Sequence, residues 1–269
     1  MRVSFTKMHG LGNDFIVLDG RETALPVISN AIAAALANRT TGIGCDQLIV
    51  LETSQEADFR MRIYNADGGE VESCGNASRA IALLHGQPAN VMTGGGIIAL
   101  EPTAGGARVD MGSPRFDWQD IPLAYGMDTA ALPVGWEELS NPVAVNVGNP
   151  HVVFFVDDCD AVALDQLGPL IETDPLFPDR INVNVATIET RDTIRLRVWE
   201  RGVGLTKACG TGACATAVAA ARIGLAERRS TVRLPGGELT IEWTDNNRIM
   251  MSGSATESYR GSFEWDDYS

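Results

Sequence analysis

The stretch Ser73-Cys-Gly-Asn-Ala77 and the stretch Ala208-Cys-Gly-Thr-Gly212 read almost alike, and they decide the fold that we expect. Each places a cysteine and a small-residue turn directly before an Ala-rich segment. A helix that begins there presents unpaired N–H groups and the positive end of its dipole, which stabilise a thiolate and bind anions. Matched cysteines in the two halves of one chain predict paired thiols that face each other across a substrate.

Both Ala-rich segments are predicted to be helices buried inside curved sheets, because alanine favours the helix and allows close packing. These helices are expected over Asn76 to His85 and over Thr211 to Ile223. Two further helices are predicted over Ile28 to Arg39, where Ile and Leu have helical spacing, and over Ala161 to Glu172.

Short alternating segments bounded by Gly, Pro, Asn and Asp predict the strands of an antiparallel or mixed sheet. In the first half they are Arg2 to Met8, Asp14 to Asp19, Gln47 to Glu52, Phe59 to Tyr64 and Ile97 to Glu101. In the second half they are Val143 to Val147, Val152 to Val156, Thr193 to Trp199, Thr231 to Leu234, Glu238 to Trp243 and Arg248 to Ser252.

The order strand, loop, Cys-Gly, Ala-rich helix, strands occurs around Cys74 and again around Cys209. We therefore expect an α+β protein of two pseudo-symmetric domains, each a curved mixed or antiparallel sheet around a central helix, with the active site in the interdomain cleft. The Pro- and Gly-rich stretch 113–141 is the expected boundary region. The predicted domains are 1–116, with Cys74, and 117–255, with Cys209; a C-terminal tail of 256–269 could return to the first domain.

Composition excludes several classes of protein. The net charge of −14, without a basic block, argues against nucleic-acid binding. No apolar run reaches the ~18 residues that span a membrane, and the N-terminus lacks the apolar region of a secretory signal. Five cysteines, odd in number and scattered, suit a reducing compartment. We therefore expect a cytoplasmic protein that contacts neither membrane nor nucleic acid.

The supply of ligand side chains argues against cofactors. Three histidines and the absence of a CxxC or HxxxH pair make a metal site improbable. Lys7 and Lys207 are the only lysines in the sequence, whereas pyridoxal phosphate needs a Schiff-base lysine. We therefore predict chemistry without a cofactor.

Two thiols can invert a carbon atom without a cofactor. A base on one face removes the weakly acidic α-proton of an amino acid while an acid on the other face returns one, and a cysteine can do either. The backbone N–H groups of the two helix starts, at Gly75, Asn76, Gly210 and Thr211, are predicted to hold the substrate α-carboxylate. The other cysteines, Cys45, Cys159 and Cys214, are interpreted as packing residues or inert surface thiols.

The chain resembles the diaminopimelate epimerases, cofactor-independent two-cysteine isomerases of lysine and peptidoglycan precursor biosynthesis. The strings that carry the resemblance run nearly end to end: Lys7-Met-His-Gly-Leu-Gly-Asn-Asp-Phe15, Gly42-Ile-Gly-Cys-Asp-Gln47, Arg62-Ile-Tyr-Asn-Ala-Asp-Gly68, Cys74-Gly-Asn76, Gly148-Asn-Pro-His151, Ile181-Asn182, Glu200-Arg-Gly-Val-Gly204 and Ala208-Cys-Gly-Thr-Gly-Ala-Cys214. The chain departs from the family pattern at Ala77-Ser78 and at Leu205, where an acidic residue is common.

The resemblance implies a reaction and its residues. Cys74 and Cys209 would be the acid/base pair that interconverts LL- and meso-diaminopimelate, with His151 and Glu200 beside them to manage their protons. It also implies a homodimer. The substrate's distal amino-acid end would be held by Asn13, Gln47, Asn65, Asn149, Asn182, Glu200 and Arg201.

Taken singly, these residues have other interpretations. The asparagines Asn13, Asn65 and Asn149 could form turns, and His151 could be a core histidine. Glu200 and Arg201 could be a surface ion pair. At the level of function, the alternatives are a racemase or epimerase of another amino acid, of histidine or hydroxyproline type, and a non-catalytic thiol-switch binding protein in which Cys74 and Cys209 form a regulatory disulfide.

Overall fold

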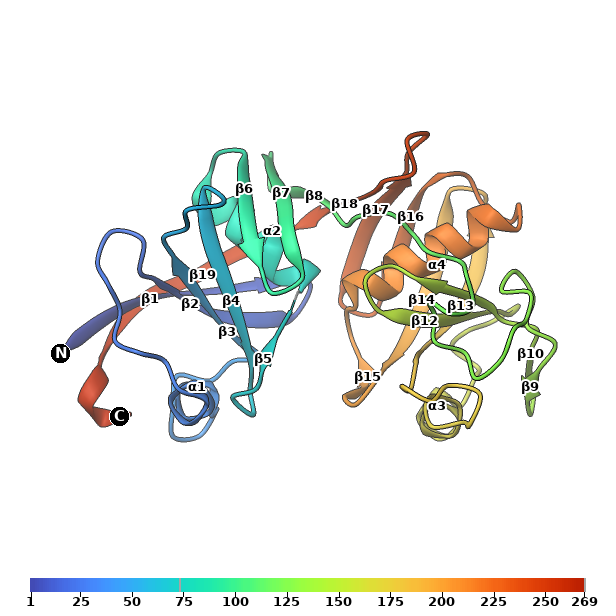
Figure 1. Ribbon diagram of the computed structural model, residues 1–269, viewed down its shortest axis with the longest axis horizontal. Helices are drawn as coiled ribbons and strands as arrows, with labels where there is room; N and C mark the ends of the chain where they lie inside the picture. Colours follow the sequence, from blue (N-terminus) through green and yellow to red (C-terminus); the bar gives the residue numbers. More distant parts are fainter. Residues whose placement is uncertain (73, 269) are drawn as a thin grey trace. The chain divides into compact units, whose positions relative to one another are not determined.

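A computed structural model describes residues 1–72 and 74–268, so that Ser73 and Ser269 lie outside the description. The chain divides into two compact units (Figure 1). Unit 1 comprises Met1–Val109 and Gly253–Ser269, and unit 2 comprises Asp110–Ser252. Each unit has its own strands, helices and core, as the α+β expectation requires.

Unit 1 is a mixed sheet with one helix on each face. Its elements are β1 (Arg2–Gly10), β2 (Asn13–Asp19), α1 (Asn30–Ala37), β3 (Gln47–Glu52), β4 (Phe59–Asn65), β5 (Glu70–Val71), α2 (Gly75–His85), β6 (Ala89–Thr93), β7 (Gly96–Thr103), β8 (Gly106–Asp110), β19 (Thr256–Glu264) and the 3-10 turn Trp265–Asp267. Strand β2 pairs parallel with β3, β3 antiparallel with β4, and β4 parallel with β6. Ile16 and Leu18 of β2 belong to the buried hydrophobic cluster that also contains residues of α1. Because side chains alternate along a strand, Phe15 and Val17, which are also buried, face the opposite side of the sheet, where α2 lies.

Unit 2 repeats this order of elements. They are β9 (Gly135–Trp136), β10 (Leu139–Ser140), β11 (Val143–Asn146), β12 (Pro150–Phe155), α3 (Leu164–Glu172), β13 (Asn182–Thr190), β14 (Thr193–Glu200), β15 (Gly204–Thr206), α4 (Gly210–Arg222), β16 (Arg229–Leu234), β17 (Gly237–Trp243) and β18 (Ile249–Ser254). Strand β12 pairs parallel with β13, β13 antiparallel with β14, and β14 parallel with β16. Helix α4 therefore corresponds to α2, and α3 to α1.

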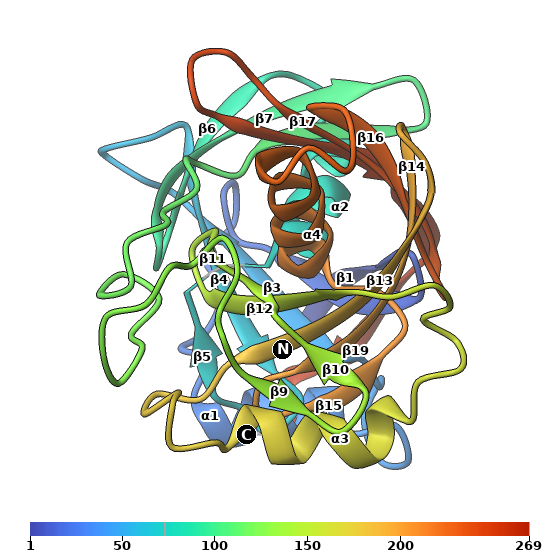
Figure 2. The same ribbon diagram turned by 90° about the vertical axis from the view of Figure 1, so that its right-hand side faces the viewer.

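Helix α4 lies within the curve of the unit 2 sheet (Figure 2). It contacts strands β11 to β14, β16 and β17, and its residues from Gly212 to Ala220 are buried. Small side chains allow this packing, because Ala and Gly let strands approach a helix closely on every side. The predicted pair of Ala-rich helices inside curved sheets, and with it the duplicated α+β fold, is confirmed.

Four predicted helices are found, and two long strands were not predicted from the sequence. Helices α2 and α4 begin at the glycine after each cysteine, one residue earlier than expected. Helix α1 is shorter than predicted because the Ser29 side chain caps it and Asn38 is extended.

Strand β13 has polar asparagines on a buried face, and β19 is largely exposed along its length. Neither strand shows the simple alternation that indicates a strand in a sequence.

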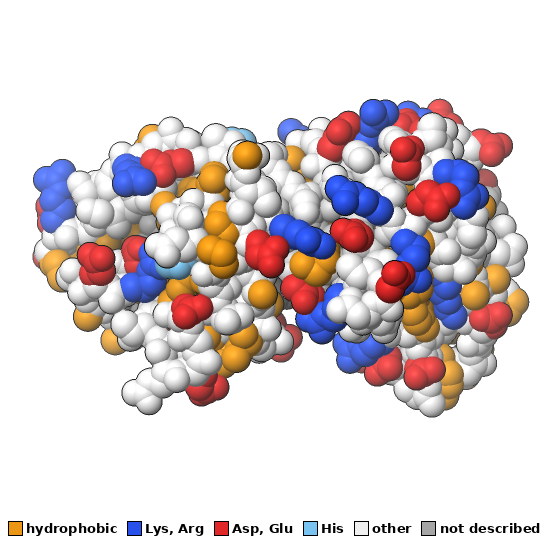
Figure 3. Space-filling view, turned by 90° about the horizontal axis from the view of Figure 1, so that it is seen from above, with side chains coloured by type: hydrophobic (Ala, Val, Ile, Leu, Met, Phe, Trp, Pro, Cys, Tyr) orange, Lys and Arg blue, Asp and Glu red, His pale blue; other side chains and the backbone are white. Residues whose placement is uncertain are grey.

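The surface mixes charges of both signs. Figure 3 shows acidic and basic side chains side by side over one face of the molecule. On unit 2, Arg195 pairs with Asp158 and Asp160, and Arg233 pairs with Glu189 and Glu238. Such exposed pairs contribute little to stability. In the described part of the chain, no helix is long and apolar enough to cross a membrane.

Candidate active site

Cys74 lies directly before α2, where the backbone is still extended. The side chain is partly exposed and makes no capping hydrogen bond to the helix. Its Sγ donates instead to Asn13 Oδ1, at 3.8 Å. The thiol of unit 1 therefore faces an amide oxygen, which accepts a hydrogen bond but has no capacity to take up the proton at ordinary pH.

The orientation of the Asn13 amide is fixed by two neighbours. Its Nδ2 donates to Asp46 Oδ2 at 3.0 Å, and its Oδ1 accepts from Asn76 Nδ2 at 3.2 Å. Asp46 is in turn held by Arg39, whose Nη2 lies 2.6 Å from Asp46 Oδ1. Because a carboxylate accepts only, the amide nitrogen must point to Asp46 and the amide oxygen to Cys74.

Three predicted polar residues meet at one edge of the unit 1 sheet. Strand β2 begins at Asn13, β3 begins at Gln47, and the antiparallel β4 ends at Asn65 opposite Gln47. Gln47 Nε2 donates to Asn65 Oδ1 at 3.0 Å. Gln47 Oε1 is buried and, within residues 1–72 and 74–268, has no hydrogen-bond partner. This edge therefore presents an acceptor oxygen that suits an ammonium group.

Cys209 occupies the equivalent position before α4, in a different environment. It is 4% exposed, and its Sγ accepts from the backbone N–H of Gly212 at 3.3 Å and lies 3.5 Å from Thr211 Oγ1. Burial raises the pKa of the Cys209 thiol well above its ordinary value, and the charge of Glu200 raises it further. The hydrogen bonds from Thr211 and Gly212 lower the pKa without reversing the shift. The hydrogen bonds at the helix start therefore favour the thiolate, as expected, while desolvation and the charge of Glu200 keep the pKa of Cys209 raised.

Glu200 is the carboxylate beside Cys209. It ends β14, and its Oε1 accepts from Thr206 Oγ1 at 2.6 Å. Burial raises the pKa of Glu200, while hydrogen bonds from Thr206 and from the Cys209 thiol oppose that rise. The surface ion pair considered for Glu200 and Arg201 is not formed, since Glu200 faces the sulfur.

His151 is a completely buried, neutral histidine on β12. Burial lowers its pKa from 6.5 to about 3. The ring Nδ1 lies 3.3 Å from Asn184 Oδ1, and Nε2 lies 3.0 Å from Asn149 Oδ1. Because Asn184 Nδ2 already donates to Gly212 O and Thr216 Oγ1, its oxygen must accept from His151 Nδ1–H. The lone pair of Nε2 then faces the Asn149 amide at the position of Oδ1, so we infer that this amide is flipped and donates from its NH₂ group.

Asn184 is a site residue that the sequence did not reveal. It is fully buried on β13 and joins His151 to the first turn of α4. The available signal was the alternation Asn182-Val-Asn184-Val in an apolar strand, where a buried asparagine needs partners.

The turn after β14 carries Arg201, and Asn182 holds it. Asn182 is 3% exposed; its Nδ2 donates to Pro150 O at 2.8 Å, and its Oδ1 accepts from the Arg201 backbone N–H at 3.0 Å. The exposed Arg201 side chain donates from Nη1 to Asp179 O at 3.0 Å. Asn182 thus places the arginine, and its amide is already used by the protein.

The remaining cysteines are all buried, in agreement with a packing role: Cys45, Cys159 and Cys214. Burial raises the pKa of Cys45 to about 12, which leaves it unreactive at neutral pH. Among the described residues there is no group of three His, Cys, Asp or Glu side chains that could hold a metal ion. In unit 2, the start of α4 brings Cys209 beside Glu200 and, through Asn184, near the neutral His151.

The fold defines a class of proteins. A phenazine biosynthesis protein of the PhzF family from Enterococcus faecalis superimposes with a TM-score of 0.71 at 15% identity, over 98% of this chain and 100% of that one. At such low identity the likeness shows the fold alone. Residues 5–116 and 143–257 match the family model of diaminopimelate epimerase. The chain belongs to the diaminopimelate epimerase family.

Two relatives show how close this membership is. A diaminopimelate epimerase of Erythrobacter litoralis is 70% identical over 269 residues, which cover 100% of both chains. A diaminopimelate epimerase of Sphingopyxis alaskensis is 60% identical over 98% of both chains. The resemblance found in the short sequence strings is therefore confirmed over the whole chain.

Proposed function

We propose that this chain is an epimerase that interconverts LL- and meso-diaminopimelate by proton transfer at the α-carbon between two cysteines. Its membership in the family, at 70% identity over the whole length of a relative of that name, carries the proposal. The equivalent positions of Cys74 and Cys209 before α2 and α4 support the two-base mechanism. An enzyme of lysine and peptidoglycan precursor biosynthesis acts in the cytoplasm, where we place this chain as a homodimer.

The contacts of Cys209 suggest how a thiolate forms. The S–H proton moves to the Glu200 carboxylate, which leaves a thiolate and a neutral carboxylic acid. Burial raises the pKa of Glu200, and this makes the carboxylate a better acceptor. Gly212 N–H and the Thr211 hydroxyl hydrogen-bond to the sulfur and stabilise its charge. The thiolate then removes the α-proton.

Cys74 supplies the second proton in that half of the reaction. Asn13 Oδ1 accepts from the thiol and disfavours the thiolate, because a hydrogen bond to the neutral form stabilises that form. The thiol of Cys74 gives its proton to the opposite face of the α-carbon and becomes a thiolate. The reverse reaction exchanges the two roles, and we propose neutral His151 as a further group that handles these protons.

The substrate would be held at both ends. The N–H groups of Gly75, Asn76, Gly210 and Thr211, in the first helical turns, are donors for the α-carboxylate. Gln47 Oε1 is an acceptor for an ammonium group, and the guanidinium of Arg201 suits a carboxylate. The other groups proposed to fix the distal end are Asn13, Asn65, Asn149, Asn182 and Glu200.

The test is exchange of the α-proton in deuterium oxide. Wild type should incorporate deuterium into diaminopimelate and interconvert its isomers, and Cys74→Ala or Cys209→Ala should each abolish interconversion without loss of the fold. Cys45→Ala is the matched control and should remain active. Near-normal activity of either variant would overturn the two-base mechanism. Equal turnover of a single-ended amino acid would favour a general racemase, and no exchange by the reduced wild type would favour a thiol-switch binding protein.

A further inference from the structure

Glu172 is a buried carboxylate outside the proposed chemistry. It ends α3 and is 5% exposed. Its Oε2 accepts from Trp199 Nε1 at 2.7 Å, and its Oε1 accepts from Gly202 N–H at 2.9 Å. Arg180 Nη1 lies 3.5 Å from Oε1. Both oxygens therefore have donors, as a buried charge requires.

The donors on Trp199 and Gly202 stand in the chain on either side of Glu200 and Arg201, two residues that the proposed function uses. Trp199 precedes Glu200, and Gly202 follows Arg201, so that the carboxylate bridges the start and the end of the turn. The turn closes through Val203 N–H, which donates to Glu200 O at 3.0 Å. A single side chain from α3 thus fixes both limits of the segment between them.

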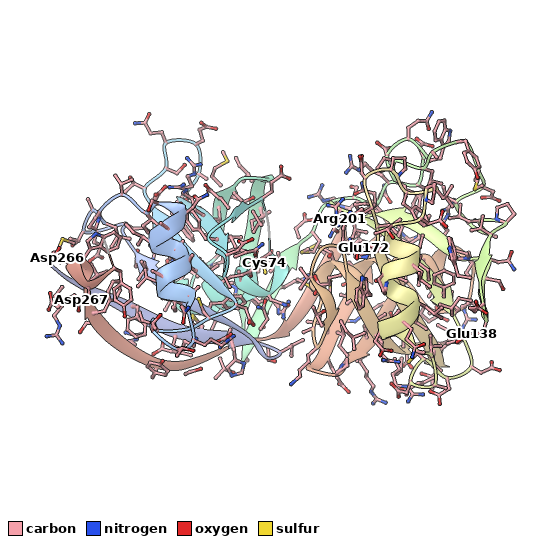
Figure 4. All side chains as sticks on the ribbon, turned by 90° about the horizontal axis from the view of Figure 1, so that it is seen from below. Cys74, Glu138, Glu172, Arg201, Asp266 and Asp267 are labelled. Carbon is pink, nitrogen blue, oxygen red and sulfur yellow. The ribbon has the colours of Figure 1, made fainter. Side chains whose placement is uncertain are left out.

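The same turn is also seated by packing and by backbone contacts. The Trp199 ring lies so close to α3 that a Cβ at Gly168 would be 2.5 Å from it. Arg201 is held through its own N–H by Asn182 and through Nη1 by Asp179 O. Figure 4 shows Glu172 at the end of α3 beside Arg201. The residues from 172 to 182 therefore form the support of the turn 199–203.

Within residues 1–72 and 74–268, Glu172 forms no ion pair with Arg201. Its ion-pair partner is Arg180, while Arg201 forms no ion pair with any residue in the part of the chain that the structure describes. A carboxylate paired with Arg201 would compete with a substrate carboxylate for the same guanidinium donors. The arrangement supports the turn and leaves to a ligand those guanidinium donors of Arg201 that Asp179 O does not use.

We propose that Glu172 is the positioning residue of the substrate-recognition turn: it holds residues 199–203 so that Arg201 presents its guanidinium to the distal carboxylate of the substrate. The inference rests on the proposed role of Arg201. A carboxylate that merely stabilised the core would affect unfolding and leave substrate affinity unchanged in the folded protein. The two roles therefore differ in KM.

Glu172→Gln tests the difference with almost no change in volume. The amide keeps one acceptor oxygen, but its NH₂ group must face either Trp199 Nε1–H or Gly202 N–H, both of which are donors. The turn then loses one of its two fixed ends. We expect KM for diaminopimelate to rise about tenfold, with a smaller change in kcat. Calorimetry in the Cys74→Ala background should show the same loss of affinity without turnover.

A double-mutant cycle with Arg201→Met assigns the effect to the arginine. If Glu172 acts through Arg201, the two substitutions together should raise KM no more than Arg201→Met alone. Glu138→Gln, an exposed glutamate on the β9–β10 turn of the same unit, is the matched control and should leave KM unchanged (Figure 4). Additive effects, or an unchanged KM in folded Glu172→Gln, would overturn the inference.

Two further outcomes need their own interpretation: a Glu172→Gln variant that does not fold, and a wild type that does not act on diaminopimelate. If Glu172→Gln does not fold, Trp199→Phe removes the Nε1–H donor, keeps an aromatic side chain at this position, and should still raise KM; an unchanged KM in that variant counts against the inference. If wild type neither binds nor turns over diaminopimelate, the proposed function itself has failed. The wild-type measurement therefore distinguishes that failure from a failure of the role of Glu172.

Discussion

Cys74 and Cys209 have equivalent places in the chain and different chemical neighbours. Cys74 faces the Asn13 amide oxygen, whereas Cys209 faces the Glu200 carboxylate. An amide oxygen orients a thiol, and a carboxylate can also accept its proton. The difference lies in single residues outside the two similar strings, and it places a carboxylate that can take up the thiol proton beside Cys209.

Replacing Glu200 with Gln should make Cys209 more reactive and the enzyme less active. The charge of Glu200 raises the pKa of the thiol, so its removal lowers that pKa. Below the pKa, the thiolate fraction rises about tenfold for each unit by which the pKa falls. Iodoacetamide should therefore alkylate Cys209 faster at about pH 8, as measured by mass spectrometry in the Cys74→Ala background. Epimerisation by the single variant should fall, and slower alkylation would contradict the assignment.

His151 should make the stability of the protein depend on pH. Its pKa is lowered from 6.5 to about 3 in the folded state, so between these values the unfolded chain binds more protons. The free energy of unfolding therefore decreases as the pH falls through that range. From about pH 7.5 to about pH 5, the contribution lost is about 2 kcal/mol. Urea unfolding at both values should show this loss in wild type, and a folded His151→Gln variant that loses just as much would contradict it.

Secondary-structure elements assemble the site through the points at which they begin and end. In unit 1, strands β2, β3 and β4 place Asn13, Gln47 and Asn65 at one edge. In unit 2, parallel pairing sets His151 of β12 beside Asn182 of β13. Strand β14 ends at Glu200, and α4 begins directly after Cys209. Because parallel neighbours share a direction, their equivalent ends meet at the same edge of a sheet.

The first turn of α4 leaves no room beside the sulfur of Cys209. A Cβ at Gly212 would lie 3.3 Å from Cys209 Sγ and 3.0 Å from Val198 Cγ2. Gly212→Ala should displace the thiol and lower kcat about tenfold or more, because small misplacements of a reacting group cost large factors in rate. The expected loss of stability is about 1–3 kcal/mol. Activity and melting temperature are measured together, and a destabilised variant with full kcat would contradict the argument.

Unit 1 depends on both ends of the sequence. Strand β19 pairs antiparallel with β1 from Arg2 opposite Glu264 to His9 opposite Thr256. Trp265, which follows β19, is buried in the same core cluster as Val3 and Phe5. The final segment thus completes the sheet that carries Cys74, although its own side chains are mostly exposed.

Ending the chain after Ala255 should therefore unfold unit 1 selectively. The deletion leaves the backbone groups of β1 without their partner strand and removes Trp265 from the core. Hydrogen exchange should accelerate across 1–109, while 110–252 keeps most of its protection because the pairings of β11 to β14, β16 and β17 are made within that range. Epimerase activity should be lost. Unchanged protection of 1–109 would show that β19 is dispensable for the fold.

The sequence by itself was enough to identify Cys74 and Cys209 as the candidate pair and to predict the helices that follow them. It was also enough to predict the duplicated α+β fold and the family. These depend on local composition and on short strings of side chains, which are present in the chain before it folds.

The tertiary structure alone decided the protonation of the site and the support of its turn. The raised pKa of Cys209, the neutral His151, the buried Asn184 and the carboxylate of Glu172 each require burial or partners supplied by another element. Glu172 and Gly202, for example, are 30 residues apart in the chain. A pKa shift or a hydrogen bond of this kind arises from the approach of distant segments and the exclusion of water, and neither is written in a local pattern.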